Sequence, residues 1–169
     1  MTSQNQVTTA YLGIGSNIDA DANISRCIQA IEQTFVNSRF SRTFESKAVG
    51  FEGDNFLNLV AEIQTELSLA DLIVALKLLE DRLGRVRGGA KFSSRHIDID
   101  ILLYGSLHCK TPIVLPREEI YENAYVLWPL AELAPELIDP KSERLFAQLW
   151  NELEFDSNEI KPIDNKTSN

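Results

Sequence analysis

Two acidic residues, Asp98 and Asp100, stand two positions apart in the segment RHIDIDILLYG, residues 95–105. Apolar residues fill the alternate positions: Ile97, Ile99, Ile101 and Leu103. This period of two predicts a β-strand with one apolar face and with both carboxylates on the other face, about 7 Å apart. At an effective dielectric constant of about 20 the carboxylates would repel by about 2 kcal/mol, so the pair predicts a cation nearby. Mg²⁺ suits such a pair, because it binds one or two carboxylates together with phosphate oxygens and water.

An arginine-rich loop lies directly before this strand. Its basic residues are Arg82, Arg85, Arg87, Lys91 and Arg95, and no acidic residue occurs between positions 82 and 97. One interpretation is a solvated basic loop; the other is an anion site, because guanidinium groups bind phosphate oxygens bidentately. Beside the two aspartates, the second interpretation predicts a magnesium–nucleotide site in which metal and arginines neutralise phosphate charge. The glycines of the loop would allow it to close over the ligand.

Other motifs for nucleotide or sugar chemistry are missing or weak. The sequence contains no G-x-x-x-x-G-K-[ST] segment, so it is not a P-loop protein. LGIGSN, residues 12–17, is too short for a dinucleotide fingerprint and predicts a turn. Two carboxylates on one strand cannot lie on both sides of a sugar ring, which argues against a glycosidase. His96 shares the face of the aspartates, either as a polar neighbour or as a contact to metal or phosphate.

Length and composition predict a single soluble domain at residues 7–155, with polar tails at 1–6 and 156–169, and we expect the motifs above to make it a catalytic domain. The 169 residues are 44% apolar and 24% charged, without a stretch long enough to span a membrane and without a signal peptide at the start. We therefore expect a cytoplasmic monomer in which Cys27 and Cys109 are ordinary thiols. A net charge of −9 argues against nucleic acid as a partner.

The predicted elements follow the order of a split βαβ motif. Strands are expected at 7–14, 38–47, 57–66, 95–105 and 107–115, and helices at 22–35, 68–84 and 142–153. The first six elements run strand, helix, strand, strand, helix, strand. This order predicts an α+β fold, a ferredoxin-like sandwich whose antiparallel sheet has helices on one face and an open, ligand-binding face. Asp98 and Asp100 would point to the open face, because the isoleucines between them must pack under the helices.

Five blocks of sequence together resemble the 6-hydroxymethyl-7,8-dihydropterin pyrophosphokinase family. The blocks are YLGIGSN (11–17), FLN (56–58), GRVR (84–87), RHIDIDILLYG (95–105) and YVLWPLAELAPEL (125–137), in the family's order. Enzymes of this family transfer pyrophosphate from ATP to the pterin hydroxymethyl group in folate biosynthesis and release AMP. The resemblance implies a Mg-dependent diphosphotransferase that binds ATP with two Mg²⁺ ions and acts on a pterin alcohol.

The resemblance also implies roles for individual residues. The implied catalytic residues are Arg85, Arg87, Arg95, Asp98 and Asp100. The two aspartates match the metal ligands, and the three arginines match loop residues that bind the ATP phosphates. The implied pterin-binding residues are Phe56, Asn58 and Tyr125. Asn58 matches an asparagine that hydrogen-bonds the pterin, and the two aromatic residues match positions that stack on its ring.

Several positions depart from the residues that are usual in the family: Lys77, Ser93, Ser94, His96, Arg117 and Asn123. An arginine is usual at position 123, and its loss would weaken phosphate neutralisation by about 1.5 to 3 kcal/mol. Arg117 and Lys77 are expected to bind ATP in compensation. Two hypotheses therefore remain: an active pyrophosphokinase, and a divergent paralogue that binds nucleotide or pterin without this activity or with another substrate. RNA binding by the sheet is disfavoured by the aspartate pair and the net charge.

Overall fold

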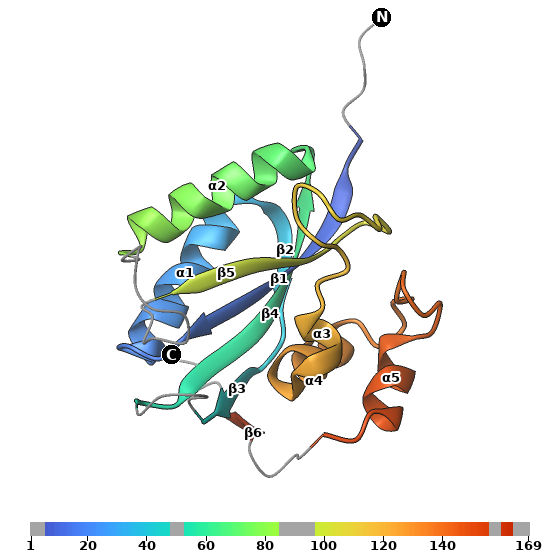
Figure 1. Ribbon diagram of the computed structural model, residues 1–169. Helices are drawn as coiled ribbons and strands as arrows, with labels where there is room; N and C mark the ends of the chain where they lie inside the picture. Colours follow the sequence, from blue (N-terminus) through green and yellow to red (C-terminus); the bar gives the residue numbers. More distant parts are fainter. Residues whose placement is uncertain (1–5, 48–52, 85–96, 156–159, 164–169) are drawn as a thin grey trace, which may run out of the picture.

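The computed structural model describes residues 6–47, 53–84, 97–155 and 160–163. Its strands are β1 (Thr8–Ser16), β2 (Val36–Phe40), β3 (Thr43–Ser46), β4 (Phe56–Thr65), β5 (Asp98–Tyr104) and β6 (Ile160–Ile163). They form one sheet in the order β5-β1-β4-β3-β6, and β2 pairs with β4 beside β3 (Figure 1). Every pairing is antiparallel. The α+β fold with an antiparallel sheet, expected from the sequence, is confirmed.

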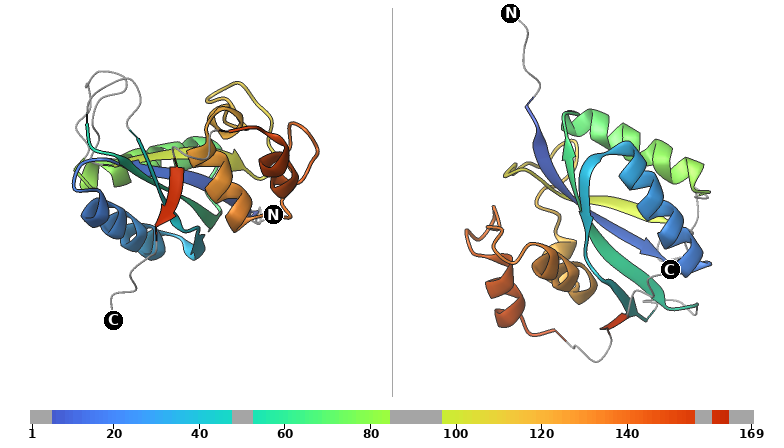
Figure 2. Two further views of the ribbon diagram at one scale, coloured as in Figure 1. Left: turned by 90° about the horizontal axis from the view of Figure 1, so that it is seen from below. Right: turned by 180° about the vertical axis from the view of Figure 1, so that it is seen from behind.

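Two long helices cover the first face of the sheet. They are α1 (Ala20–Thr34) and α2 (Leu69–Arg82), which lie across the sheet in the view from behind (Figure 2, right). Their buried apolar stripes pack on the inward side chains of three strands, among them Leu12 of β1, Leu59 of β4 and Ile99 of β5. Each of these positions belongs to an alternating apolar series, so the larger core follows directly from the period of two in the sequence.

Three shorter helices pack on part of the second face, which is therefore less open than the sequence predicts. They are α3 (Glu119–Glu122), α4 (Ala124–Leu133) and α5 (Phe146–Glu152). A second buried cluster joins them to the sheet, with Val60 and Leu102 on the strands and Leu127, Leu130 and Phe146 on the helices. Helices are thus not confined to one face (Figure 2, left). No helix in the described ranges is long and apolar enough to cross a membrane.

A bulge in β5 changes which residues point to each face. Leu12 of β1 pairs with Ile101, whereas Tyr11 pairs with Leu103, so Leu102 is an extra residue on β5. Ile101 belongs to the first core, but Leu102 and Leu103 both belong to the second. The prediction that Leu103 continues the isoleucine face is therefore wrong. The alternation is intact before the bulge, where Asp98 and Asp100 lie.

Three other predicted segments differ in the structure. The turn expected at 12–17 is mostly strand, because β1 continues to Ser16. The strand expected at 107–115 is reduced to one isolated bridge between Cys109 and Leu115. Residues 160–163, expected to belong to a polar tail, form β6, which pairs with β3 and buries Ile160. The sheet therefore extends beyond residue 155, where the sequence places the end of the domain.

Candidate active site

The two aspartates lie on the second face of the sheet, next to two glycines of β1. Ile99, between them, is buried under the helices of the first face, so the alternating side chains of Asp98 and Asp100 point the other way. Gly15 pairs with Asp98, and Gly13 pairs with Asp100. Because glycine has no side chain, neighbouring side chains come close to the β1 backbone here: Leu102 lies over Gly13, and the Asn58 amide lies over Gly15. The sequence predicts the face on which the acids lie. It does not predict that two glycines of β1 lie beside them.

Arg117 brings a positive charge to Asp100. Its Nη2 lies 3.9 Å from Asp100 Oδ1, and its Nε donates a hydrogen bond to the Ile101 carbonyl oxygen at 3.0 Å. The backbone N–H of Arg117 also bonds to the Leu102 carbonyl oxygen at 3.0 Å. Arg117 is thereby held on β5 at three points. The compensating charge expected from the sequence therefore lies beside one of the two acids.

Desolvation by burial raises the pKa of Asp100 to about 7, and the neighbouring charge of Asp98 adds to the increase. Arg117 acts in the opposite direction and lowers this pKa. About half of the Asp100 side chain, 47%, is nevertheless accessible to solvent. The carboxyl group is thus poorly hydrated but reachable, which favours binding of a cation that would offset the repulsion between the two acids.

Asn58 lies on the same face, across Gly15 from Asp98. Gly15 pairs with Asp98 of β5 on one side and with Asn58 of β4 on the other. Two strand spacings separate the acid from the amide, about 10 Å between Cα atoms. The Asn58 Nδ2 atom donates a hydrogen bond to Ser46 Oγ of β3 at 3.1 Å. Ser46 therefore orients the amide, a role that sequence reasoning missed because the contact joins two strands.

Two aromatic residues expected at the site lie near these groups. Phe56 precedes Asn58 by two positions on β4 and is half-buried on the same face. Tyr125 lies in the first turn of α4. Burial raises the pKa of the Tyr125 hydroxyl, and the carboxylates of Glu119 and Asp100 contribute to the increase. Tyr125 thus lies within the electrostatic influence of Asp100.

The remaining predicted residues are less closely tied to this face. Lys77 is exposed on α2, the helix that contacts β5 on the first face. Asn123, where the resemblance leads us to expect arginine, is partly buried between α3 and α4, and its backbone oxygen accepts from Leu127 N at 3.0 Å. The predicted residues Arg85, Arg87, Ser93, Ser94, Arg95 and His96 lie outside the described residues.

The chemistry of this donor set fits Mg²⁺ accompanied by phosphate. In the described part of the chain no group of three or more His, Cys, Asp or Glu side chains could enclose a metal ion. Two carboxylates at one end of a sheet match a cation that takes its other ligands from phosphate and water. Asp98 and Asp100 would hold such an ion.

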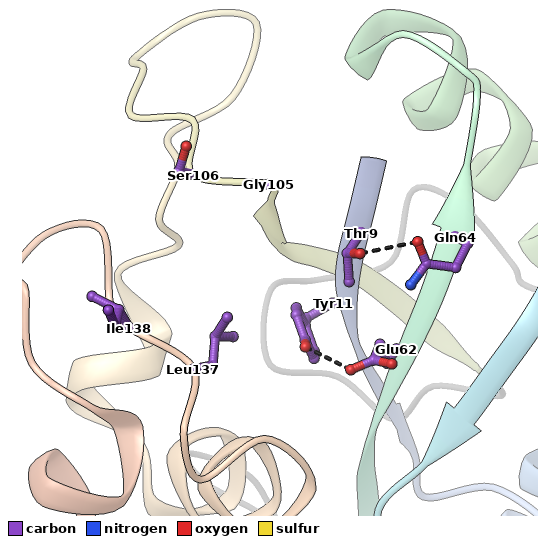
Figure 3. A pocket seen from close by; sticks show the side chains of 8 residues that line it. All are labelled: Thr9, Tyr11, Glu62, Gln64, Gly105, Ser106, Leu137 and Ile138. Atoms are coloured by element: carbon purple, nitrogen blue, oxygen red, sulfur yellow. Dashed lines mark hydrogen bonds between the residues drawn. The ribbon is translucent and has the colours of Figure 1, made fainter. Parts of the chain in front are cut away.

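Two hollows in the described part of the protein lie at the opposite end of β1 and β4 from the aspartates. A cavity of about 340 Å³ is lined by Thr9 and Tyr11 of β1, Glu62 and Gln64 of β4, and residues 105–106 and 137–138 (Figure 3). A second hollow of about 540 Å³ shares Glu62 and Gln64 with it. Inside the first, Tyr11 donates to Glu62 at 2.6 Å and Thr9 donates to Gln64 at 3.0 Å. Neither hollow is lined by Asp98 or Asp100. The candidate site is therefore defined by its acidic, amide and aromatic side chains and not by a cavity.

Comparison with known proteins supports the same reading of the sequence. The model of the 7,8-dihydro-6-hydroxymethylpterin-pyrophosphokinase (HPPK) family matches residues 11–135. A 2-amino-4-hydroxy-6-hydroxymethyldihydropteridine pyrophosphokinase from Aquifex aeolicus is 36% identical over 137 residues, covering 79% of this chain and 85% of that protein. The protein of the same name from Haemophilus influenzae is 33% identical over 141 residues, covering 80% of this chain and 87% of its own length.

Solved structures share the fold. Wild-type Plasmodium falciparum HPPK-DHPS superimposes with a TM-score of 0.70 at 12% identity over 89% of this chain. This chain covers 42% of that longer protein, and the likeness concerns the fold alone. The family match and the relatives at more than 30% identity confirm the resemblance stated from the five blocks. This chain therefore belongs to the 7,8-dihydro-6-hydroxymethylpterin-pyrophosphokinase family.

Proposed function

We propose that this protein transfers pyrophosphate from ATP to 6-hydroxymethyl-7,8-dihydropterin and releases AMP. The observation that carries the proposal is the row of residues across three strands, with Asp98, Gly15 and Asn58 side by side on one face. It supports the proposal because an acid that can bind a metal lies about two strand spacings from an amide that can recognise a pterin. The named activity of the related pyrophosphokinases supports the same reaction.

The proposed reaction requires charge neutralisation and alignment, with no covalent enzyme intermediate. Bound Mg²⁺, two ions as in the family, would withdraw charge from the phosphates and favour attack by the pterin hydroxyl. Asp98 and Asp100 would hold the metal and, through it, the triphosphate. Arg117, already beside Asp100, supplies positive charge to the phosphate oxygens.

Pterin recognition is assigned to the other end of the same row. Asn58 presents its amide to the edge of the pterin ring, with Nδ2 directed to Ser46 and Oδ1 above Gly15. Phe56 and Tyr125 provide aromatic surfaces for the ring faces. We further assign the loop residues Arg85, Arg87 and Arg95, and Lys77 of α2, to the ATP phosphates or nucleoside, as the family resemblance implies.

Release of AMP from Mg-ATP and 6-hydroxymethyl-7,8-dihydropterin tests the proposal. We expect turnover that requires both substrates and Mg²⁺. Asp98→Ala and Asp100→Ala should each abolish Mg-dependent nucleotide binding while circular dichroism shows an unchanged fold. Absence of turnover above background would contradict the proposed reaction.

A divergent paralogue is the second candidate, favoured by Asn123 at a position where the family resemblance implies arginine. Isothermal titration calorimetry distinguishes it from the active enzyme. Tight binding of Mg-ATP or pterin without AMP formation would support the paralogue. We also propose a cytoplasmic monomer without nucleic-acid or membrane partners, which size-exclusion chromatography and cell fractionation can test.

A further inference from the structure

A buried glutamate lies on the first face of the sheet, on the opposite side of β5 from the two aspartates. Glu80 belongs to α2, and 3% of its surface is accessible to solvent. Its Oε2 accepts a hydrogen bond from the backbone N–H of Ile99 at 3.1 Å. Ile99 is the residue that separates Asp98 from Asp100. A helix side chain therefore contacts the backbone of β5 between the two acids.

The surroundings of Glu80 make this contact unusual. Its neighbours on the buried stripe of α2 include Leu76 and Leu79, and they pack in the apolar core of the first face. Burial of a carboxyl group in such a core is unfavourable unless hydrogen bonds replace its lost hydration. A leucine would fit the pattern of the helix better, so folding alone does not account for an acid at this position.

The position of β5 in the sheet gives the contact a specific purpose. β5 is the end strand, and within the described ranges it pairs with β1 alone. An end strand has a partner strand on one side only, so groups on its other edge need side chains or loops as hydrogen-bond partners, as Ile101 and Leu102 have in Arg117. A side-chain acceptor at Ile99 provides a second attachment at the point where the aspartates leave the strand.

We propose that Glu80 is a positioning residue for the metal site. By holding the Ile99 N–H it fixes the backbone between Asp98 and Asp100, so that both carboxylates keep the spacing and direction needed to share a metal-bound triphosphate. The inference rests on the proposed function, because it assigns the aspartates to a metal. Groups that orient metal ligands from behind change metal affinity about 10- to 100-fold when they are removed.

Three variants separate this role from simple structural support. Glu80→Leu removes the acceptor and suits the apolar core. Glu80→Gln keeps an oxygen that can accept from Ile99 but carries no charge. Glu32→Gln, on the exposed side of α1, is the control for the same chemical change away from the site. Circular dichroism and thermal melts establish that each variant is folded before binding is measured.

Binding of Mn²⁺ together with α,β-methylene ATP, which blocks the transfer, gives the affinity by calorimetry. Amide hydrogen exchange at Ile99, measured by NMR without metal, reports directly on the contact. We expect Glu80→Leu to weaken Mn²⁺ binding by about tenfold or more and to speed exchange at Ile99. Glu80→Gln should keep most of the Mn²⁺ affinity and most of the slow exchange at Ile99. Glu32→Gln should change neither quantity.

Two contrary results overturn the inference. If folded Glu80→Leu binds Mn²⁺ as tightly as the wild type, Glu80 supports the core only. Glu80→Gln could instead bind Mn²⁺ as weakly as Glu80→Leu while exchange at Ile99 stays slow. In that case the negative charge of Glu80, and not its hold on the backbone, supports metal binding. Failure of the wild-type protein to bind Mn²⁺ with the nucleotide would instead contradict the proposed function, so the two failures are distinguishable.

Discussion

Gly15 lies against the side-chain amide of Asn58 so closely that a Cβ atom on Gly15 would be 2.8 Å from Asn58 Oδ1. Such an approach is too short for a carbon–oxygen contact, so any side chain at position 15 must displace the amide. The amide is also held from the other direction by Ser46. The orientation of Asn58 therefore depends on the absence of a side chain in the neighbouring strand.

Gly15→Ala should weaken pterin binding more than it lowers stability. Displacement of the Asn58 amide would cost the hydrogen bonds of that group to the ligand, about 1 to 3 kcal/mol. Calorimetry with 6-hydroxymethyl-7,8-dihydropterin measures the loss. In the double variant with Asn58→Ala, the effect of Gly15→Ala should largely disappear, because the displaced group is gone. Additive losses in this cycle would contradict the proposed link.

Asp100→Asn should stabilise the metal-free protein at neutral pH. The pKa of Asp100 is about 7 in the folded protein and about 4 in an unfolded chain, so between these values the folded state binds more protons. The free energy of unfolding contributed by this group therefore falls as pH rises from about 4 to about 7. Asp100→Asn has no carboxyl group at this position, so it does not lose this stability as pH rises. Its melting temperature should exceed that of the wild type at pH 8 but match it below pH 4.

The control for this prediction is Asp54→Asn, at an exposed position before β4. Its melting temperature relative to the wild type should not vary with pH in the same way. Mg²⁺ with ATP should raise the melting temperature of the wild type and not of Asp100→Asn. A wild-type protein more stable than Asp100→Asn throughout pH 4 to 8 would contradict the raised pKa.

Arg117→Ala should raise the pKa of Asp100 further and lower kcat/KM for ATP. The guanidinium group currently lowers that pKa, and in the proposed reaction it also neutralises phosphate charge. Loss of a charge-assisted hydrogen bond of about 1.5 to 3 kcal/mol corresponds to roughly 10- to 100-fold in kcat/KM. Carboxyl-carbon NMR titration and steady-state kinetics provide the two readouts.

Arg117→Lys is the matched variant for this experiment. It keeps the charge but loses the geometry of the Nε bond to the Ile101 carbonyl oxygen. We expect an intermediate defect in kcat/KM and a smaller change in the Asp100 pKa than in Arg117→Ala. Unchanged kinetics in both variants would remove Arg117 from the proposed ATP site.

Removal of β6 should destabilise the protein and expose the edge of β3. Truncation after Phe155 removes the four backbone-paired residues Ile160–Ile163, and with them the buried side chain of Ile160. An uncovered edge strand promotes association between chains. We expect a lower melting temperature and aggregation on heating, measured by calorimetry and light scattering. Truncation after Ile163 is the control and should leave both unchanged.

The sequence predicts the face on which the aspartates lie because a period of two needs no knowledge of other strands. It cannot predict that Gly15 stands between Asp98 and Asn58, since register between strands depends on the whole sheet. The Ser46 contact was missed for the same reason. Arg117 was expected to supply charge, but its attachment to β5 required the path of the chain after residue 105.

The helix expected at 142–153 is found as α5, but α3 and α4 of the same layer are not predicted, because α4 lacks an amphipathic pattern. The α4 segment AYVLWPLAEL is apolar on nearly every side and contains Pro129. Such a segment gives no indication of which side is buried or what covers it. β6 was missed because IKPI is short and interrupted by Pro162, and its partner β3 lies more than a hundred residues earlier.

The extra residue in β5 lets one short strand serve two environments that demand opposite side chains. Before Leu102, the second face of β5 carries the two acids; from Leu102 on, the same face carries leucines that pack with α3 and α4. Deletion of one residue here would turn either the acids or the leucines to the wrong side. The polar and the apolar halves of this strand can therefore be changed independently, provided that the number of residues between Ile101 and Leu103 is preserved.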